Sequence, residues 1–446
     1  MIYSNSKKEE ILYEIESKLI PTESLSSISH KFKQEIEERL IHSENSMLPS
    51  FLKKSTHQSY NPHKSDSILA IDFGGTNLKF AIFKTYPNYS IQYMNSMTVQ
   101  NKIVDLKFFN NIVETIILEI NDYFMTQQIS SKDISISITF SFPLNSNNEI
   151  TAMGKHFVLT DEIRGKPIDN ILQCAFNKFA MIHLNGKFNF WVNENIINDS
   201  IAVHLTNKYI CDKNNDVKNK NKNKQISLIL GTGLNTCFEV PFAKLPNFKK
   251  QFTSTITNDN ANNDDVIINS ELGFLGTDII KLCEEFDVVS SLKMPMPLEN
   301  ITSGNYLPEI LKRILNYYHI YPELTINFDG EMFCQLIEGE DIKSMLSDVD
   351  IEFIRDIALI VLERASIYIV GAIEAINLFV NDNEKNKKRE ASNNENKRIN
   401  IGYVGSFLAY GKTYQELIDK HSKGHINLQF LPDSSLIGAA VIAEKY

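Results

Sequence analysis

A carboxylate that follows an amide at the end of an apolar run is the first feature of this sequence that could do chemistry. Asp199 stands in Ile196-Ile197-Asn198-Asp199-Ser200. In α/β folds ligands sit beyond the carboxyl ends of strands, so a carboxylate delivered there is a candidate general base. Asn-Asp is also a common turn sequence, and a solvated loop carboxylate is the alternative interpretation.

A second chemical pattern surrounds Asp72, which stands near the end of a strand pattern over 68–73. A tight turn and another strand pattern, 78–83, follow it. Glycines let a backbone approach a ligand closely, and Thr and Asn side chains add donors for phosphate oxygens. Asp72 could hold Mg²⁺ through water, although a Gly-Gly hairpin is often only a hairpin. The candidate phosphate-binding residues here are Gly74, Gly75, Thr76, Asn77 and Lys79.

The same kind of turn recurs after a strand pattern over 226–230, as Gly231-Thr232-Gly233-Leu234-Asn235. Two strand–Gly–Thr–Asn units in one chain are less easily explained by chance than one. They suggest a duplicated architecture, although no repeat is visible at the level of single residues.

Further polar residues follow apolar segments in the same way. Ser141 comes at the end of a strand pattern over 134–142, and Glu271 follows an apolar strand pattern that begins at Val266. Glu299 precedes a helix expected from Tyr306. Lys155 lies in Gly154-Lys155-His156. Taken singly, each of these charged residues could be an ordinary solvated side chain.

The elements that must position these residues can be read from hydrophobic periodicity. Two amphipathic helices open the chain, over 11–19 and 28–40, and we expect them to pack on a larger body without chemistry of their own. Helical patterns also cover 112–120, 201–209 and 351–380, and a last helix begins near Asp433-Ser434-Ser435. Three Asn-rich stretches, 213–224, 258–265 and 381–400, read as loops.

Composition excludes several classes of protein. The 446 residues, 43% of them hydrophobic, can bury a large core in two or three domains, and a net charge of -10 argues against nucleic-acid binding. Five scattered cysteines without a CxxC pair indicate neither disulfides nor a zinc site. No secretory signal and no membrane span is visible, so a cytoplasmic location is expected.

Together, six motifs resemble the hexokinase family of eukaryotes, and most closely a divergent hexokinase-like branch of budding yeasts. The resemblance implies an α/β fold of the two-lobed actin-like ATPase (RNase H-like) type, with a cleft between a small and a large domain. It implies N-terminal helices over 1–65, a small domain over 66–197, a large domain over 198–431 and a returning helix over 432–446. The motifs are Asp72-Phe73-Gly74-Gly75-Thr76-Asn77-Leu78-Lys79, Phe140-Ser141-Phe142-Pro143, Ile197-Asn198-Asp199-Ser200, Gly231-Thr232-Gly233-Leu234-Asn235, Asn269-Ser270-Glu271 and Glu299-Asn300-Ile301-Thr302-Ser303-Gly304.

The resemblance implies an ATP-dependent hexose 6-phosphotransferase that uses Mg²⁺. Asp199 would take the proton from the C6 hydroxyl of the sugar, and Lys155 would offset charge there. The other implied sugar ligands are Ser141, Asn198, Asn235, Glu271 and Glu299. The implied nucleotide and phosphate ligands are Asp72, Gly74, Gly75, Thr76, Asn77, Lys79, Gly231, Thr232, Gly233, Gly405 and Ser406, with Asp72 also holding Mg²⁺ through water.

The sequence departs from the family pattern at the expected sugar site and at the expected nucleotide site. Gly154 stands where the family has a threonine, which opens space for an N-acetylated hexosamine. Lys79 replaces an arginine, and Val404 replaces an aspartate of the adenosine motif. We therefore expect a hexose or a hexosamine as substrate and a relaxed preference for the nucleotide base. A monomer or a homodimer fits the family.

Two functions remain open at this point. The first is an active cytosolic sugar kinase of carbohydrate metabolism, acting on glucose or a related hexose such as N-acetylglucosamine. The second is a catalytically weak hexokinase-like protein that binds sugar as a regulator or sensor. Retention of Asp199 favours the kinase, because a pure binder does not need the base, whereas the altered adenosine motif keeps the second function under consideration.

Overall fold

The computed structural model describes residues 3–50, 52, 67–74, 77–85, 89–126, 132–153, 157–214, 225–250, 265–287, 296–320, 328–340, 350–385 and 398–445. The chain forms two compact units. The first contains Met1–Leu48, Asn221–Pro246 and Asp265–Pro432, and the second contains Pro49–Lys220, Asn247–Asp264 and Asp433–Tyr446. Gly75, Thr76, Gly154, Lys155 and most of the three Asn-rich stretches lie outside the described residues.

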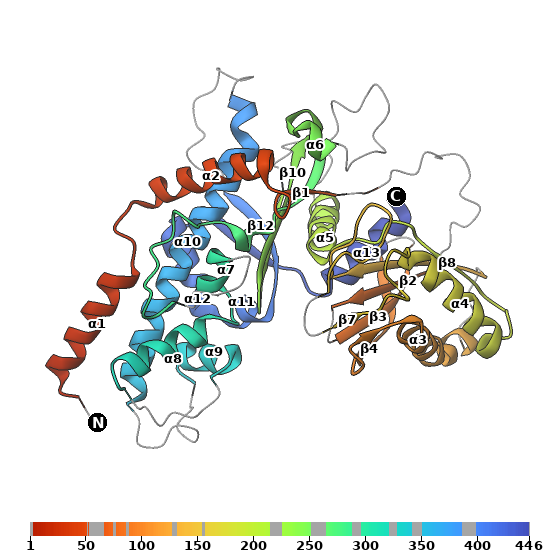
Figure 1. Ribbon diagram of the computed structural model, residues 1–446, viewed down its shortest axis with the longest axis horizontal. Coiled ribbons are helices and arrows are strands. Elements are labelled where there is room, and N and C mark those ends of the chain that lie inside the picture. The colour runs from red at the N-terminus through yellow and green to blue at the C-terminus, as the bar shows by residue number, and fades with distance from the viewer. Residues whose placement is uncertain are drawn as a thin grey trace. The chain divides into compact units, whose positions relative to one another are not determined.

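The second unit is built on a five-stranded sheet of order β4-β3-β2-β6-β8 (Figure 1). Strands β2 and β3 form the predicted antiparallel hairpin, and β6 runs parallel to β2 on its other side. The elements of this unit are β2 (Ser67–Phe73), β3 (Asn77–Lys84), β4 (Ser90–Thr98), β5 (Ile103–Val104), α3 (Leu106–Thr126), β6 (Asp133–Phe140), β7 (Val158–Leu159), α4 (Ile168–Leu184), β8 (Asn189–Val192), α5 (Asp199–Asn214), α6 (Asn247–Lys250) and α13 (Ser434–Lys445).

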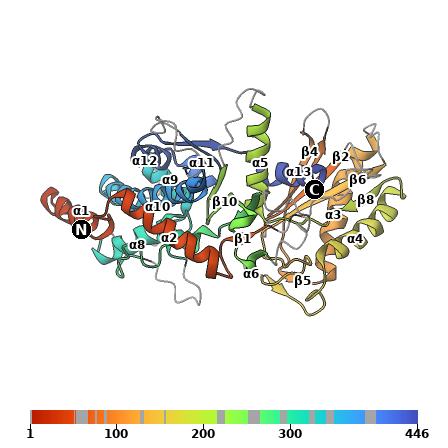
Figure 2. The ribbon, with the colours of Figure 1, turned by 90° about the horizontal axis from the view of Figure 1, so that it is seen from above.

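Successive side chains of β2 point to opposite faces of this sheet and pack on different helices. Leu69, Ile71 and Phe73 point into a core shared with α3 and α4. Ile68 and Ala70, on the opposite face, pack on α13 instead. Figure 2 shows α3 and α4 on one side of this sheet and α13 on the other. Because side chains alternate with period two, Asp72 lies on the α13 face.

The first unit repeats the same strand order. Its sheet runs β1-β11-β10-β9-β12-β13, in which β9, β10, β11, β12 and β13 correspond in pairing to β2, β3, β4, β6 and β8. In both sheets each of the first three strands in chain order is antiparallel to the next, and the last two run parallel to the first. The duplicated architecture suggested by the two glycine turns is therefore present, and the two-lobed α/β fold class is confirmed.

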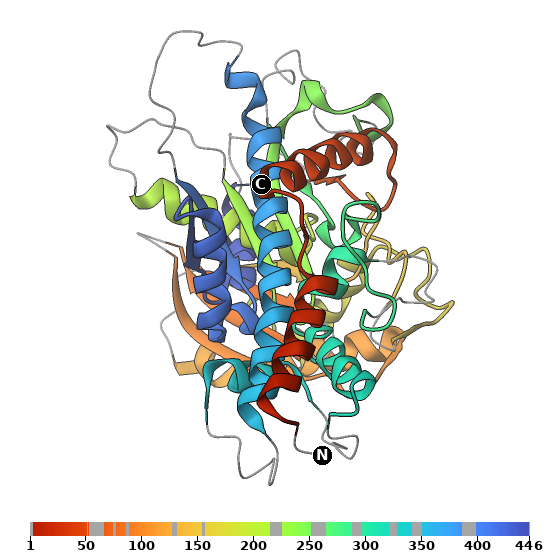
Figure 3. The ribbon, with the colours of Figure 1, turned by 90° about the vertical axis from the view of Figure 1, so that its left-hand side faces the viewer.

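The remaining elements of the first unit surround this sheet. They are α1 (Asn5–Leu19), α2 (Leu25–His42), β1 (Leu48–Pro49, at the unit border), β9 (Ile226–Leu230), β10 (Leu234–Pro241), η1 (Phe242–Lys244), β11 (Asp265–Asn269), η4 (Leu272–Phe274), α7 (Pro297–Thr302), α8 (Leu307–Tyr317), α9 (Gly330–Glu338), α10 (Ile351–Lys385), β12 (Ile399–Val404), α11 (Ser406–Tyr410), α12 (Lys412–Ser422) and β13 (Ile426–Phe430). The two N-terminal helices pack on the long helix α10, as Figure 3 shows.

The two compact units differ from the predicted domains in several places, because residues 49–65, 198–220 and 247–264 all cluster with the second unit. Helix α5 clusters with the second unit, where Gly438 of α13 lies against Ala202. A Cβ atom on Gly438 would lie 2.1 Å from the carbonyl oxygen of Ala202, so only glycine permits this crossing. The border between the small and the large domain at residue 198 stays a prediction. No described helix is long and apolar enough to cross a membrane.

Candidate functional site

The first group of candidate residues lies at the carboxyl ends of neighbouring strands in the second unit's sheet. Asp72 of β2 pairs in register with Thr139 of β6, and Thr139 forms a parallel bridge with Ile197. The backbone of Ile197 accepts from Phe140 at 2.8 Å and donates to Ile138 at 3.1 Å. Asp199 therefore stands two residues beyond the last paired position, where α5 begins. The fold delivers both carboxylates to the same edge of the sheet.

Asp199 is held by neighbours on both oxygens. The hydroxyl of Ser141 donates to Oδ2 at 3.0 Å, and the backbone N–H of Ser200 donates to Oδ1 at 2.8 Å. Asn198 caps the helix, because its Oδ1 accepts from the N–H and the hydroxyl of Ser200. Asp199 lies in the first turn of α5, where a negative charge is stabilised by the helix dipole. Its orientation is thus fixed before any ligand binds.

Asp72 has a different environment from Asp199. Burial raises the pKa of Asp72 to about 6, and the nearby charge of Asp199 acts in the same direction. A hydrogen bond from the hydroxyl of Thr139, 2.7 Å from Oδ1, and the positive charge of Lys79 lower this pKa. Ser435, at the head of α13, also bonds to this carboxyl group. A buried acid with a raised pKa, surrounded by donors, is typical of a functional site.

The first unit carries the second group of candidates around the start of β10. Asn235 Nδ2 donates to Asn269 Oδ1 at 2.8 Å and to Glu271 Oε1 at 3.4 Å. Asn269 Nδ2 donates to the same Glu271 oxygen at 2.8 Å. Asn235 Oδ1 accepts from the N–H of Thr236 at 2.7 Å, which fixes the amide orientation with its NH₂ group toward Asn269 and Glu271. The predicted residues Asn235 and Glu271 therefore form one polar cluster with Asn269.

Glu299 lies beside this cluster, on α7. Its Oε2 accepts from the N–H of Leu234 at 2.9 Å. A Cβ atom on Gly233 would lie 2.9 Å from that same oxygen, and one on Gly273 would lie 3.0 Å from Glu299 Cβ. Glycine at both positions makes room for the carboxylate. Burial raises the pKa of Glu299, and the bond from Leu234 opposes that rise.

The second glycine turn lies next to another candidate segment of the same unit. The N–H of Gly231 donates to the carbonyl of Gly233 at 3.0 Å, and Thr232 at the tip is exposed. A Cβ atom on Gly231 would lie 3.3 Å from Gly405 Cα and 3.8 Å from Ser406 N. Gly405 has φ +115°, and a Cβ atom there would lie 2.3 Å from the carbonyl oxygen of Leu230. Two glycine backbones in contact form a surface to which phosphate groups can come close.

The two groups of candidate residues belong to different units. The structure brings Asp72, Asp199, Ser141 and Asn198 to one sheet edge of the second unit, with Lys79 paired opposite Asp72. Gly74 and Asn77 close the first turn through a bond of 3.1 Å between their backbones. In the first unit it brings Asn235, Glu271 and Glu299 together, and separately Gly231, Thr232, Gly233, Gly405 and Ser406.

Three residues of these groups were missed from the sequence. Asn269 stands in a motif that was recognised for Glu271 alone, and its spacing of two from Glu271 was the available signal. Thr139 touches Asp72 only because of the register between β2 and β6. Ser435 lies at the start of the last predicted helix, and nothing in the sequence indicated that it bonds to Asp72.

The described residues contain no group of three or more His, Cys, Asp or Glu side chains that could hold a metal ion. Magnesium ions commonly keep several waters and bind to one or two carboxylates together with substrate phosphates. Asp72, a single carboxylate beside a glycine turn, suits that mode of binding and does not suit a cage made only of protein ligands.

Comparisons with known proteins point to one family. Two family profiles, both described as hexokinase, match residues 11–209 and 225–444. N-acetylglucosamine kinase 1 of Candida albicans is 23% identical over 89% of this chain and 85% of its own length. Hexokinase-1 of Schizosaccharomyces pombe is 23% identical over 70% of this chain and 61% of its own length.

Solved structures show the same fold. A hexokinase crystal structure superposes with a TM-score of 0.72 over 98% of this chain and 99% of that chain, at 18% identity. A hexokinase from Schistosoma mansoni, solved with glucose, superposes with a TM-score of 0.66 over 99% of both chains, at 18% identity. At these identities the likeness establishes the fold.

Proposed function

Because this chain belongs to the hexokinase family, we propose that it catalyses transfer of the terminal phosphoryl group of ATP to the C6 hydroxyl of a hexose or hexosamine. The observation that carries the proposal is the arrangement around Asp199. Its two oxygens are oriented by Ser141 and Ser200 at the carboxyl edge of the sheet, where a general base is expected.

The residues of the first unit suit recognition of a sugar. A hexose presents hydroxyl groups that both donate and accept, so a pocket for it needs amides and carboxylates. The cluster of Asn235, Asn269 and Glu271 offers an oriented amide donor beside a carboxylate acceptor, and Glu299 adds a second carboxylate. Each well-placed hydrogen bond to a charged group contributes roughly 1.5–3 kcal/mol. We propose that this cluster holds the sugar hydroxyls other than the one that reacts.

The proposed reaction needs mainly positioning and charge neutralisation. Asp199 would accept the proton of the C6 hydroxyl as the oxygen attacks the γ-phosphorus and ADP leaves, with Ser141 and the N–H of Ser200 keeping the carboxylate in place. Lys155, which lies outside the described residues, would offset negative charge at this point. The two glycine turns, Lys79, Gly405 and Ser406 would bind the phosphates, and Asp72 would hold Mg²⁺ through water. When bound, that ion neutralises charge on the β- and γ-phosphate oxygens.

The first testable consequence concerns Asn269. In Asn269→Ala, Glu271 loses a donor at 2.8 Å, and the amide of Asn235 loses the closer of its two acceptors. We expect sugar affinity to fall roughly ten- to hundredfold, with little change in the KM for nucleotide. Calorimetric titration with sugar measures this. Asn427→Ala is the matched control, because Asn427 also bonds to an amide, Asn400, but at an exposed position on another strand pair of the same sheet. An unchanged sugar affinity in Asn269→Ala would show that this cluster does not bind the sugar.

The identity of the sugar can be narrowed. The Candida albicans relative that spans most of this chain is named an N-acetylglucosamine kinase. Gly154, in place of the threonine that the family resemblance leads one to expect, removes a side chain next to Lys155. We propose that the chain phosphorylates N-acetylglucosamine as well as glucose, and prefers the former. We further propose a role in cytoplasmic carbohydrate metabolism, as a monomer or a homodimer.

The direct test is a substrate panel read by product. Purified protein is incubated with Mg²⁺, ATP or GTP, and either glucose, mannose, fructose or N-acetylglucosamine, and the products are identified by ³¹P and ¹³C NMR. The proposal predicts 6-phosphates, with N-acetylglucosamine the winner in direct competition with glucose. If glucose is phosphorylated faster than N-acetylglucosamine in this competition, the proposed preference for N-acetylglucosamine is wrong. If no sugar phosphate forms although sugar binding is measurable, the protein is not a kinase. The alternative function, a catalytically weak sugar-binding regulator, then holds.

A further inference from the structure

The segment that carries Glu271 has few hydrogen bonds of its own. Residues 270–276 lie between β11 and the loop that follows, and only the short helix η4 gives them regular structure. Within the segment, the N–H of Phe274 bonds to the carbonyl of Glu271 at 3.1 Å, and that of Leu275 to Leu272 at 3.0 Å. Buried backbone groups that lack such bonds need partners elsewhere.

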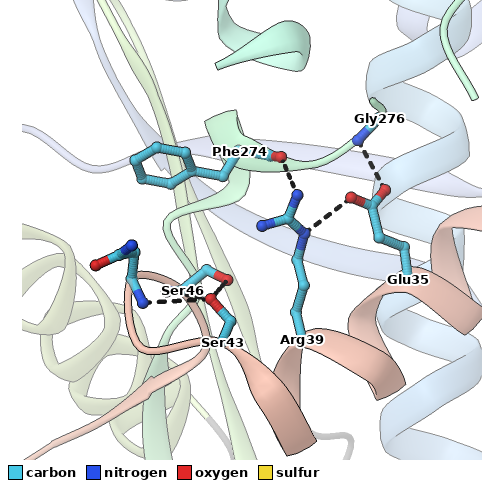
Figure 4. Close-up of polar contacts among 7 residues, drawn as sticks. Glu35, Arg39, Ser43, Ser46, Phe274 and Gly276 are labelled. Carbon is cyan, nitrogen blue, oxygen red and sulfur yellow. Dashed lines mark hydrogen bonds and ion pairs between the residues drawn. The ribbon is translucent and has the colours of Figure 1, made fainter. Parts of the chain in front are cut away.

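Some of those partners belong to neighbouring elements, since the N–H of Ser270 donates to Thr236 and the carbonyl of Leu275 accepts from Leu298. Others come from the N-terminal part of the chain. The guanidinium of Arg39 donates to the carbonyl of Phe274 at 2.6 Å, and Glu35 Oε2 accepts from the N–H of Gly276 at 2.7 Å. Arg39 and Glu35 are themselves joined at 2.8 Å. Beyond the end of α2, the N–H of Met47 donates to the carbonyl of Ser270 at 3.1 Å. Figure 4 shows Arg39 and Glu35 of α2 reaching Phe274 and Gly276.

Glu271 is sensitive to how this segment is held. It has a positive φ of 50°, a backbone conformation that is uncommon for residues other than glycine. Its carbonyl is bonded to Phe274, whose own carbonyl is bonded to Arg39. Gly273, in the same segment, lies against Glu299. A shift of the segment would therefore displace both carboxylates of the proposed sugar site.

We propose that the Glu35–Arg39 pair of α2 positions the segment 270–276 and thereby sets the affinity for sugar. This inference rests on the proposed sugar site, and it gives the N-terminal helices a role beyond covering the core. Arg39 and Glu35 are positioning residues, since they touch the loop and not the substrate. Two bonds leave the guanidinium in different directions, one to Glu35 and one to Phe274, which a lysine ammonium reproduces poorly.

The test compares Arg39→Ala with a control that loses the same kind of bond. Arg355 of α10 donates from Nε and Nη2 to the carbonyl of Ile337, at 3.1 and 3.0 Å, in the same unit but on the carboxyl end of α9. We expect Arg39→Ala to raise the KM for sugar about tenfold, with the KM for ATP little changed. Arg355→Ala should leave the KM for sugar at the wild-type value while costing similar thermal stability.

Two further variants keep the test decisive. Glu35→Gln retains an oxygen acceptor for Gly276 but weakens the pair with Arg39, so its KM for sugar should lie between those of the wild type and Arg39→Ala. Arg39→Lys should resemble Arg39→Ala more than the wild type. Equal KM values for sugar in wild type, Arg39→Ala and Glu35→Gln would overturn the inference, as would an equal rise in Arg355→Ala. Wild-type protein that neither binds nor phosphorylates sugar would instead refute the proposed function.

Discussion

Asp199→Ala should lower kcat for sugar phosphorylation by roughly 10²–10⁴-fold, the usual contribution of a positioned general base. The C6 hydroxyl would lose the group that accepts its proton, whereas the proposed sugar ligands Asn235, Glu271 and Glu299 belong to the other unit and are unchanged. Sugar binding should therefore remain measurable by calorimetry while turnover is lost.

Two other variants show whether the loss is specific. Ser141→Ala should reduce kcat by less, because it removes one orienting bond of 3.0 Å and leaves the carboxylate. Asp212→Ala, at an exposed position further along α5, should behave as wild type. If Asp199→Ala turned over sugar at a rate within a few fold of wild type, Asp199 would not be the base.

Asp72→Asn should abolish most of the activity and at the same time stabilise the protein above pH 7. The native pKa of about 6 lies above the ordinary value of 3.8, so folding favours the protonated form. The wild-type protein gains stability as the pH falls from above 6 toward 3.8, and at pH 8 it bears the full cost of the buried charge. That cost amounts to at most about 3 kcal/mol, from roughly two pH units at 1.36 kcal/mol each.

Thermal unfolding without nucleotide or Mg²⁺ measures this effect. The melting temperature of Asp72→Asn should exceed that of the wild type at pH 8, and the gap should shrink by pH 5, where the wild-type carboxyl group is largely protonated. Asp161→Asn, whose carboxylate is almost fully exposed, should show no such pH dependence. A variant at position 72 that is less stable than wild type at pH 8 would contradict the raised pKa.

Much of this fold could be predicted because its signals are local. The glycine turns after 68–73 and 226–230, the long helical pattern from 351 and the order of short motifs indicated the family, and the comparisons confirm it. Helix α4, strand β8 and the short helix α7 that carries Glu299 were not foreseen. Strand β8 has only four residues, and α7 has six, too few for a periodic pattern.

The parts of the site that escaped prediction depend on pairing between distant segments. Thr139 reaches Asp72 through the register of two parallel strands 67 residues apart. Arg39 reaches Phe274 across 235 residues, from a helix whose pattern indicated only a covering role. Sequence spacing carries no information about such contacts. By contrast, Ser141, Asn198 and Asp199 could be grouped in advance because each follows the end of an apolar run.

A crystal structure of the protein with N-acetylglucosamine or glucose bound would test the proposed site most directly. We predict a sugar whose unreactive hydroxyls contact Asn235, Glu271 and Glu299, with its C6 hydroxyl about 2.6–3.2 Å from an oxygen of Asp199. A sugar bound elsewhere, or an Asp199 carboxylate turned away from the bound sugar, would contradict the assignment of both the base and the pocket.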